Sequence, residues 1–123
     1  MTSEDVQKIV ERELAEYTYV PPPPGTTYGT PWSQDKVYRY RDELLTHLVE
    51  PVLKQVILRD TYAQVTASTL QFADVWVVAE FAGYLIFFDP AHAEFGLAQQ
   101  SVVGSGYVTI GVRGDLVGVY CAA

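Results

Sequence analysis

Val75-Trp76-Val77-Val78-Ala79 and Tyr84-Leu85-Ile86-Phe87-Phe88 are two apolar runs separated by a short segment that contains Ala82-Gly83. Their β-branched and aromatic residues suit a pleated, largely buried surface. A glycine between two such runs is typical of the turn in a β-hairpin. The stretch therefore predicts two paired strands, at 74–80 and 84–89, and places the core of the protein in its C-terminal half.

The same pattern continues on both sides of this hairpin. From Thr61 to Ala123 the chain carries only six charged side chains, and most of them lie where a turn or a strand end is expected. Short apolar segments punctuated by glycine and proline predict an antiparallel β-meander over 62–121. Besides the central hairpin, its expected strands are 62–69, 94–100, 107–112 and 115–121.

One part of the meander allows two interpretations. Asp89-Pro90 could begin a short helix that runs to Ala98, because alanine, glutamate and leucine in this segment are helix formers. Gly96 and the short spacing favour a hairpin instead.

The N-terminal half is helical in pattern. Val6, Ile9, Val10 and Leu14 recur at helical spacing and predict an amphipathic helix over 3–17. A second apolar face begins after Ser33 and continues past Pro51, which predicts a helix over 34–58, kinked at that proline. The alternative is a helix that ends at Glu50 and is followed by a strand, as the proline and the β-branched residues suggest.

These elements predict a single α+β domain over residues 1–123. Two N-terminal helices would pack on one face of an antiparallel β-meander of about five or six strands. The chain is long enough to bury one core without metals or disulfides.

The charge of the chain limits its partners. Fifteen acidic residues against eight basic ones give a net charge of −7, and seven of the eight bases precede residue 60. No basic stripe is available for phosphates, so neither nucleic acid nor an anionic membrane is expected as a partner. A basic protein would be favoured electrostatically. One cysteine, Cys121, and no apolar leader predict a cytoplasmic protein.

A proline- and glycine-rich connection over 20–33 is surrounded by aromatic residues. Tyr19, Tyr28 and Trp32 lie in or beside it. A stiff segment that presents Tyr and Trp loses little entropy on binding, which makes these three residues candidates for a protein-binding surface. The alternative is a structural linker whose prolines pack on the protein's own aromatic rings.

Few residues offer chemistry. His47, four positions after Glu43, could form a His–carboxylate pair at the mouth of a pocket. Asp89, His92 and Glu94 place three metal-ligand types in six residues, but a tight turn directs such side chains into solvent, so no metal site is predicted. No cofactor motif is present, and Cys121 is expected to be buried and inert.

The sequence thus favours a small acidic cytoplasmic protein-binding module without its own catalytic activity, such as an adaptor, an inhibitor or an immunity-type partner. Its apolar C-terminal half also suggests a homodimer. The alternative function is a small-ligand-binding protein or enzyme that uses a pocket between helices and curved sheet, with His47 or Glu43 at its mouth.

Overall fold

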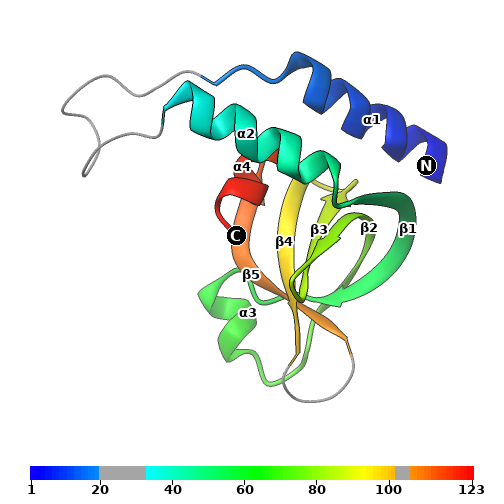
Figure 1. Ribbon diagram of the computed structural model, residues 1–123. Coiled ribbons are helices and arrows are strands. Elements are labelled where there is room, and N and C mark those ends of the chain that lie inside the picture. Colours follow the sequence, from blue (N-terminus) through cyan, green and yellow to red (C-terminus); the bar gives the residue numbers. More distant parts are fainter. Residues whose placement is uncertain (20–32, 102–105) are drawn as a thin grey trace.

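A computed structural model describes residues 1–19, 33–101 and 106–123. It has an α+β architecture, with the two N-terminal helices, α1 (Ser3–Glu16) and α2 (Gln34–Leu45), lying over one side of a strongly curved sheet (Figure 1). Within the described residues, every helix is too short or too polar to cross a membrane.

The sheet is an antiparallel meander of five strands. They are β1 (Leu48–Ile57), β2 (Phe72–Phe81), β3 (Tyr84–Asp89), β4 (Glu94–Gln100) and β5 (Tyr107–Gly114). Each strand pairs with the next one along the chain. A parallel bridge between Ile57 and Val108 joins β1 to β5 and closes the sheet into a barrel.

The curved sheet separates two apolar cores. The concave side encloses a small core that includes Val75, Leu85 and Phe87. The opposite side, with Ile86 and Phe88, packs against the helices in a larger core. Alternation along β3 explains this division, because successive side chains in a strand point to opposite faces. The central apolar runs are therefore continuous because both faces of the hairpin are buried.

Local capping fixes both N-terminal helices. The side chain of Thr2 accepts a hydrogen bond from the Asp5 N–H, and Asp5 binds the Thr2 N–H in return, which completes a capping box. The side chain of Ser33 caps α2 by accepting from the Lys36 N–H. The C-terminal helix, α4 (Leu116–Cys121), lies between α2 and the sheet.

The predicted long helix over 34–58 is wrong. The helix ends at Leu45, and residues from Leu48 onward form β1. The apolar spacing after Pro51 belongs to a strand in which Val56 is buried while Val52 and Leu53 are exposed. Pro51 is tolerated because the ladder with β2 is irregular between Leu48 and Val52, where a missing N–H costs little.

Two segments of the predicted meander over 62–121 are helical instead of extended. Residues 62–69 were expected as a strand, but Thr61 and Gln64 form a capping box that starts the short helix α3 (Tyr62–Thr66). The expected last strand, 115–121, is α4, which begins where the Asp115 side chain accepts from the Gly118 N–H. Over 90–98 the hairpin is confirmed, since β4 starts at Glu94.

Candidate functional site

A groove runs between α1 and the chain that leads from α2 into β1. Its cavity volume is about 510 Å³. One wall presents the α1 side chains spaced at i, i+3, i+4 and i+7, which share one face of the helix. The lining residues are Gln7, Val10, Glu11, Leu14, Leu45, Leu48, Val49, Glu50 and Pro51.

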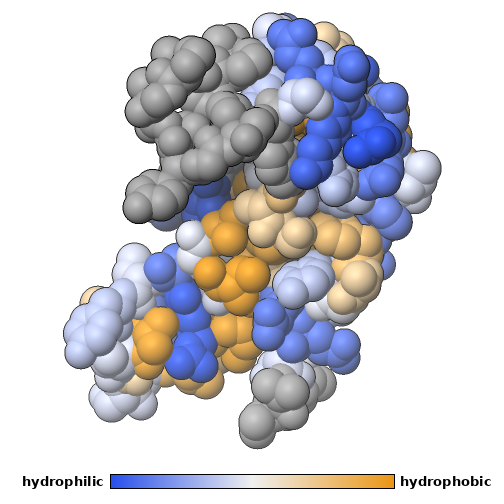
Figure 2. Space-filling view, turned by 60° about the vertical axis from the view of Figure 1, so that its left-hand side comes forward, coloured by the Kyte–Doolittle hydropathy of each residue, from blue (hydrophilic) through white to orange (hydrophobic). Residues whose placement is uncertain are grey.

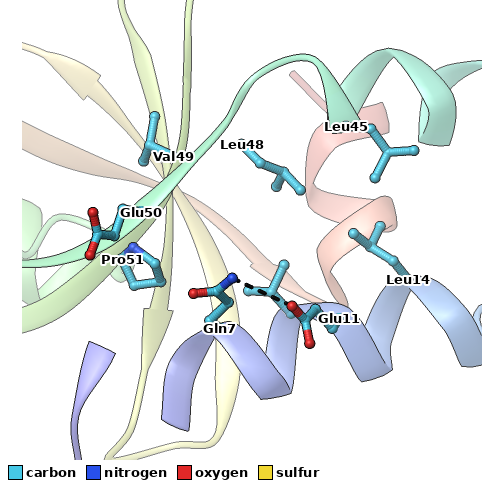
Figure 3. A pocket seen from close by; sticks show the side chains of 9 residues that line it. Gln7, Glu11, Leu14, Leu45, Leu48, Val49, Glu50 and Pro51 are labelled. Atoms are coloured by element: carbon cyan, nitrogen blue, oxygen red, sulfur yellow. Dashed lines mark hydrogen bonds between the residues drawn. The ribbon is translucent and has the colours of Figure 1, made fainter. Parts of the chain in front are cut away.

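The groove combines aliphatic and polar side chains. Leu14 on α1 faces Leu45 across it, and Leu48 lies beside Leu45 on the same wall (Figure 3). The Gln7 side-chain amide donates to Glu11 Oε1 at 3.4 Å, and Glu50 lies on the opposite wall. Leu45 is 50% exposed and lies outside the buried core, so its side chain is available to a ligand.

Hydrogen bonds at both ends of α1 fix the width of the groove. Ser3 Oγ donates to the Pro51 carbonyl oxygen at 2.7 Å, which ties the start of α1 to β1. The Leu116 N–H donates to Glu13 Oε1 at 3.3 Å, which ties the end of α1 to α4. The two walls are thereby held in place before any ligand arrives, so binding would cost little ordering.

A second candidate site surrounds Tyr120 on α4. Tyr40, Phe81, Tyr120, Cys121 and Ala123 line a cavity of about 270 Å³. The Tyr120 hydroxyl donates to Glu43 Oε2 at 3.4 Å, and the His47 ring lies 6.1 Å from the Tyr120 ring, centroid to centroid. The structure thus brings Glu43 and His47, the two residues of the alternative pocket, to one tyrosine, although neither of them is among the residues that line the cavity.

Burial and charge act on the ionisable groups of this second site. Burial, reinforced by the Glu43 carboxylate, raises the pKa of Tyr120. Burial, with help from Asp115, also raises the pKa of the Cys121 thiol. Both groups are therefore held in their neutral forms at neutral pH, which makes Cys121 a poor nucleophile.

The turn with three metal-ligand types is an ion-pair cluster organised by Arg113. Its guanidinium contacts Asp89 Oδ2 and Asp60 Oδ2, each at 2.7 Å, and Glu94 at 3.5 Å. His92 Nδ1 lies 2.9 Å from Asp89 Oδ2. The described residues hold no group of three or more side chains suited to a metal ion. Asp89 and Glu94, two of the three residues of this turn, are therefore ion-paired with Arg113.

The three candidate binding residues of the aromatic segment are only partly placed. Tyr28 and Trp32 lie outside the described residues. Tyr19 is half-buried: its N–H donates to the Tyr38 hydroxyl at 3.3 Å, and its carbonyl accepts from the Gln34 side chain at 3.4 Å. Its backbone is therefore held against α2, and its role in binding stays a prediction.

No relative was found. Models of protein families, curated protein sequences and solved structures all gave no match. The function of this chain therefore has to be argued from its own surfaces.

Sequence reasoning named Glu43 and His47 of the second site but missed the groove and Tyr120, for identifiable reasons. The groove depends on Leu45, and the sequence feature that could have revealed it is the pair Leu44-Leu45. Two adjacent residues of a helix do not both point into the core, and Leu44 is the buried one, so Leu45 is left on the surface. Tyr120 was missed because its segment was interpreted as a strand. No sequence signal could place it beside Glu43, which is 77 residues away.

Proposed function

We propose that this protein is a binding module for another protein, and that the α1–β1 groove receives an amphipathic, basic segment of that partner. The observation that carries the proposal is the groove itself, which is lined mainly by apolar side chains together with Glu11 and Glu50. Such a groove accepts an aliphatic side chain while its carboxylates attract a neighbouring Lys or Arg. The net charge of −7 adds long-range attraction for a basic partner.

The protein would act as an adaptor, an inhibitor or an immunity-type partner, in the cytoplasm and as a homodimer. The lone thiol, Cys121, is consistent with a reducing compartment. Tyr19, Tyr28 and Trp32 remain candidates for a second contact with the partner.

Selection of displayed peptides tests this proposal. A random peptide library is selected on the wild-type protein and on Leu45→Asp, with Leu70→Asp as the matched control. Leu70 is 58% exposed and Leu45 50%, so both changes replace a half-exposed leucine, but only Leu45 lines the groove. We expect wild type and Leu70→Asp to enrich peptides that combine aliphatic residues with Lys or Arg.

Binding of the enriched peptides to Leu45→Asp should be at least about tenfold weaker, a loss of about 1.4 kcal/mol. Glu50→Lys should weaken the same peptides by repelling their cations. If no sequence is enriched, or if enriched peptides bind Leu45→Asp as tightly as wild type, the groove is not the binding site and the proposal is wrong.

A second candidate function, a small-ligand-binding protein or enzyme, is favoured by one observation. Glu43 and His47 both contact Tyr120, which lines the 270 Å³ cavity. A pocket with a few polar groups on an aromatic wall is typical of a small-molecule site. Ligand-observed NMR with small molecules, compared between wild type and a Tyr120 variant, tests this candidate.

A further inference from the structure

Three aromatic side chains from three separate elements meet at the second site. Tyr40 comes from α2, Phe81 from the end of β2 and Tyr120 from α4, and together they line the cavity of about 270 Å³. The Tyr120 ring lies 6.3 Å from Tyr40 and 5.0 Å from Phe81, and the planes are inclined by 59° and 66°. The Tyr120 ring thus contacts the other two rings around one cavity. We refer to these three residues as the aromatic pocket.

A second layer of rings supports the aromatic pocket. The His47 ring lies 5.5 Å from Phe81, and the Tyr84 ring lies 6.0 Å from it. Phe81 is also fixed by its position directly before the tight turn at Ala82-Gly83, where both residues have positive φ (48° and 82°). The pocket is therefore organised without a ligand, as binding sites with a low ordering cost are.

The electrostatic environment of the pocket favours a cation. The faces of aromatic rings carry negative charge density, and a cation within about 6 Å of a ring centroid is attracted to it. Glu43, which accepts from the Tyr120 hydroxyl, adds a carboxylate beside this pocket residue. Two charges act on the pKa of Cys121 on the pocket wall. Asp115 raises this pKa and Lys36 lowers it, and the effect of Asp115 is the larger.

We propose that the aromatic pocket binds an organic cation of the size of a trimethylammonium or guanidinium group. This inference rests on the second candidate function, because it names the ligand class of the same site. The ring faces would surround the cation, and the Glu43 carboxylate would complete its neutralisation. Protein binding in the α1–β1 groove does not depend on it.

The test compares choline with 3,3-dimethylbutan-1-ol, which has the same shape but no charge. Stacking of the methyl groups on the rings shifts their proton resonances upfield, and titration of this shift gives a dissociation constant for each compound. We expect choline to bind at least about tenfold more tightly, as a cation–π site with a carboxylate requires. Equal affinities would overturn the assignment of a cation. Absence of any shift would overturn the pocket as a small-ligand site.

Variants locate the binding. Tyr120→Leu should abolish the choline shift, whereas the matched control Tyr62→Leu should retain it, because Tyr62 is 84% exposed and lies outside the pocket. Glu43→Gln covers the case in which Tyr120→Leu fails to fold, since Glu43 is exposed and its loss leaves the core intact. It should weaken choline several-fold and leave the neutral compound unchanged. Retention of full choline affinity in Glu43→Gln and in a folded Tyr120→Leu would contradict the proposal.

Two further measurements are informative. The first determines where the cation comes from, and the second determines whether the two sites bind independently. N-acetyl-arginine amide that binds more tightly than choline indicates a side chain of a partner protein, and the reverse order indicates a free small molecule. Both outcomes support a cation site. Leu45→Asp should bind choline as wild type does, so loss of groove binding and loss of cation binding are distinguished.

Discussion

Gly96 gives the ring of Phe87 the space that it occupies in the barrel. The two residues are direct partners in the β3–β4 ladder. A Cβ atom on Gly96 would lie 2.4 Å from Phe87 Cζ, far inside van der Waals contact. Phe87 is fully buried, so its ring has no room to move away.

We therefore expect Gly96→Ala to lower the free energy of unfolding by about 1–3 kcal/mol through overpacking. Urea denaturation of the purified protein measures this change. Phe87→Leu in the same chain should recover part of the loss, because a shorter side chain accommodates the new methyl group. An additive double variant would show that the close approach is not the cause.

The Arg113 cluster predicts how stability depends on pH. Burial opposes ionisation of Asp89, but hydrogen bonds from His92 and Arg113 outweigh it and lower the pKa of this carboxyl below 3.8. A lowered pKa in the folded state means that the ionised form contributes stability at neutral pH. That contribution is lost as the pH falls below 3.8 toward the folded-state value.

Asp89→Asn should destabilise the protein at pH 7 by about 2 kcal/mol, because a buried charge-assisted contact is lost. The difference between the variant and wild type should shrink at pH 3, since Asp89 of the unfolded chain is then largely protonated and has to lose its proton on folding. Urea midpoints at both pH values provide the comparison. A difference that is the same at pH 3 and pH 7 would contradict the predicted shift.

At the scale of the secondary-structure elements, short polar caps decide which segments are helical. Asp115 follows Gly114, whose φ of 148° ends β5, and its side chain binds the Gly118 N–H at 3.0 Å to begin α4. Leu116, Val117 and Val119 then become buried between α2 and the sheet. This segment has the apolar composition of a strand, but the cap at Asp115 and the packing against α2 and the sheet make it a helix.

Asp115→Ala should therefore cost about 1 kcal/mol of stability through loss of the cap. Asp115→Asn is the matched control and should cost much less, because its side-chain oxygen still accepts the Gly118 N–H. Thermal denaturation followed by circular dichroism measures both variants. Equal destabilisation by Ala and Asn would show that the charge of Asp115, and not its capping bond, is what matters.

For the whole molecule, apolar surface remains where the helical layer ends. Cross-strand pairing puts Leu53 beside Trp76 and Ile57 beside Phe72 on one face of β1–β2, and Phe72 is 50% exposed. A different face, between α3 and the helices, is also largely apolar (Figure 2). A hollow of about 420 Å³ is lined by the apolar residues Val65, Val108 and Ile110 together with polar ones, Arg59, Gln99, Gln100, Ser101 and Thr109.

We predict that the β1–β2 face mediates self-association at micromolar concentration, because its exposed apolar side chains would be buried against a second copy. A stable dimer of this kind buries about 1,000 Å² or more. Sedimentation equilibrium should give a mass that rises with concentration for wild type. Phe72→Glu should shift the protein to the monomer, whereas Tyr62→Glu, a substitution of an exposed aromatic residue on α3, should not. A monomer at all concentrations of wild type would contradict the prediction.

How far the sequence predicts this protein depends on the range of the interactions involved. It determines the α+β class, α1 and the central hairpin, because these follow from apolar periodicity and a local turn. Residues 48–57 combine helical spacing with strand-forming residue types, and pairing with β2 decides in favour of a strand. The interpretation of this segment as a helix rests on local spacing alone. It fails because the β2 residues that pair with the segment are distant in sequence.

The candidate sites show the same limit more strongly. Glu43 and His47 were identifiable as residue types, but their meeting at Tyr120 requires α4 to pack under α2. The groove likewise exists because Ser3 binds Pro51 across 48 residues. The sequence by itself determined which segments must be buried and that the molecule is acidic. Only the tertiary structure decided which side chains share a surface, because that depends on long-range packing that no local pattern encodes.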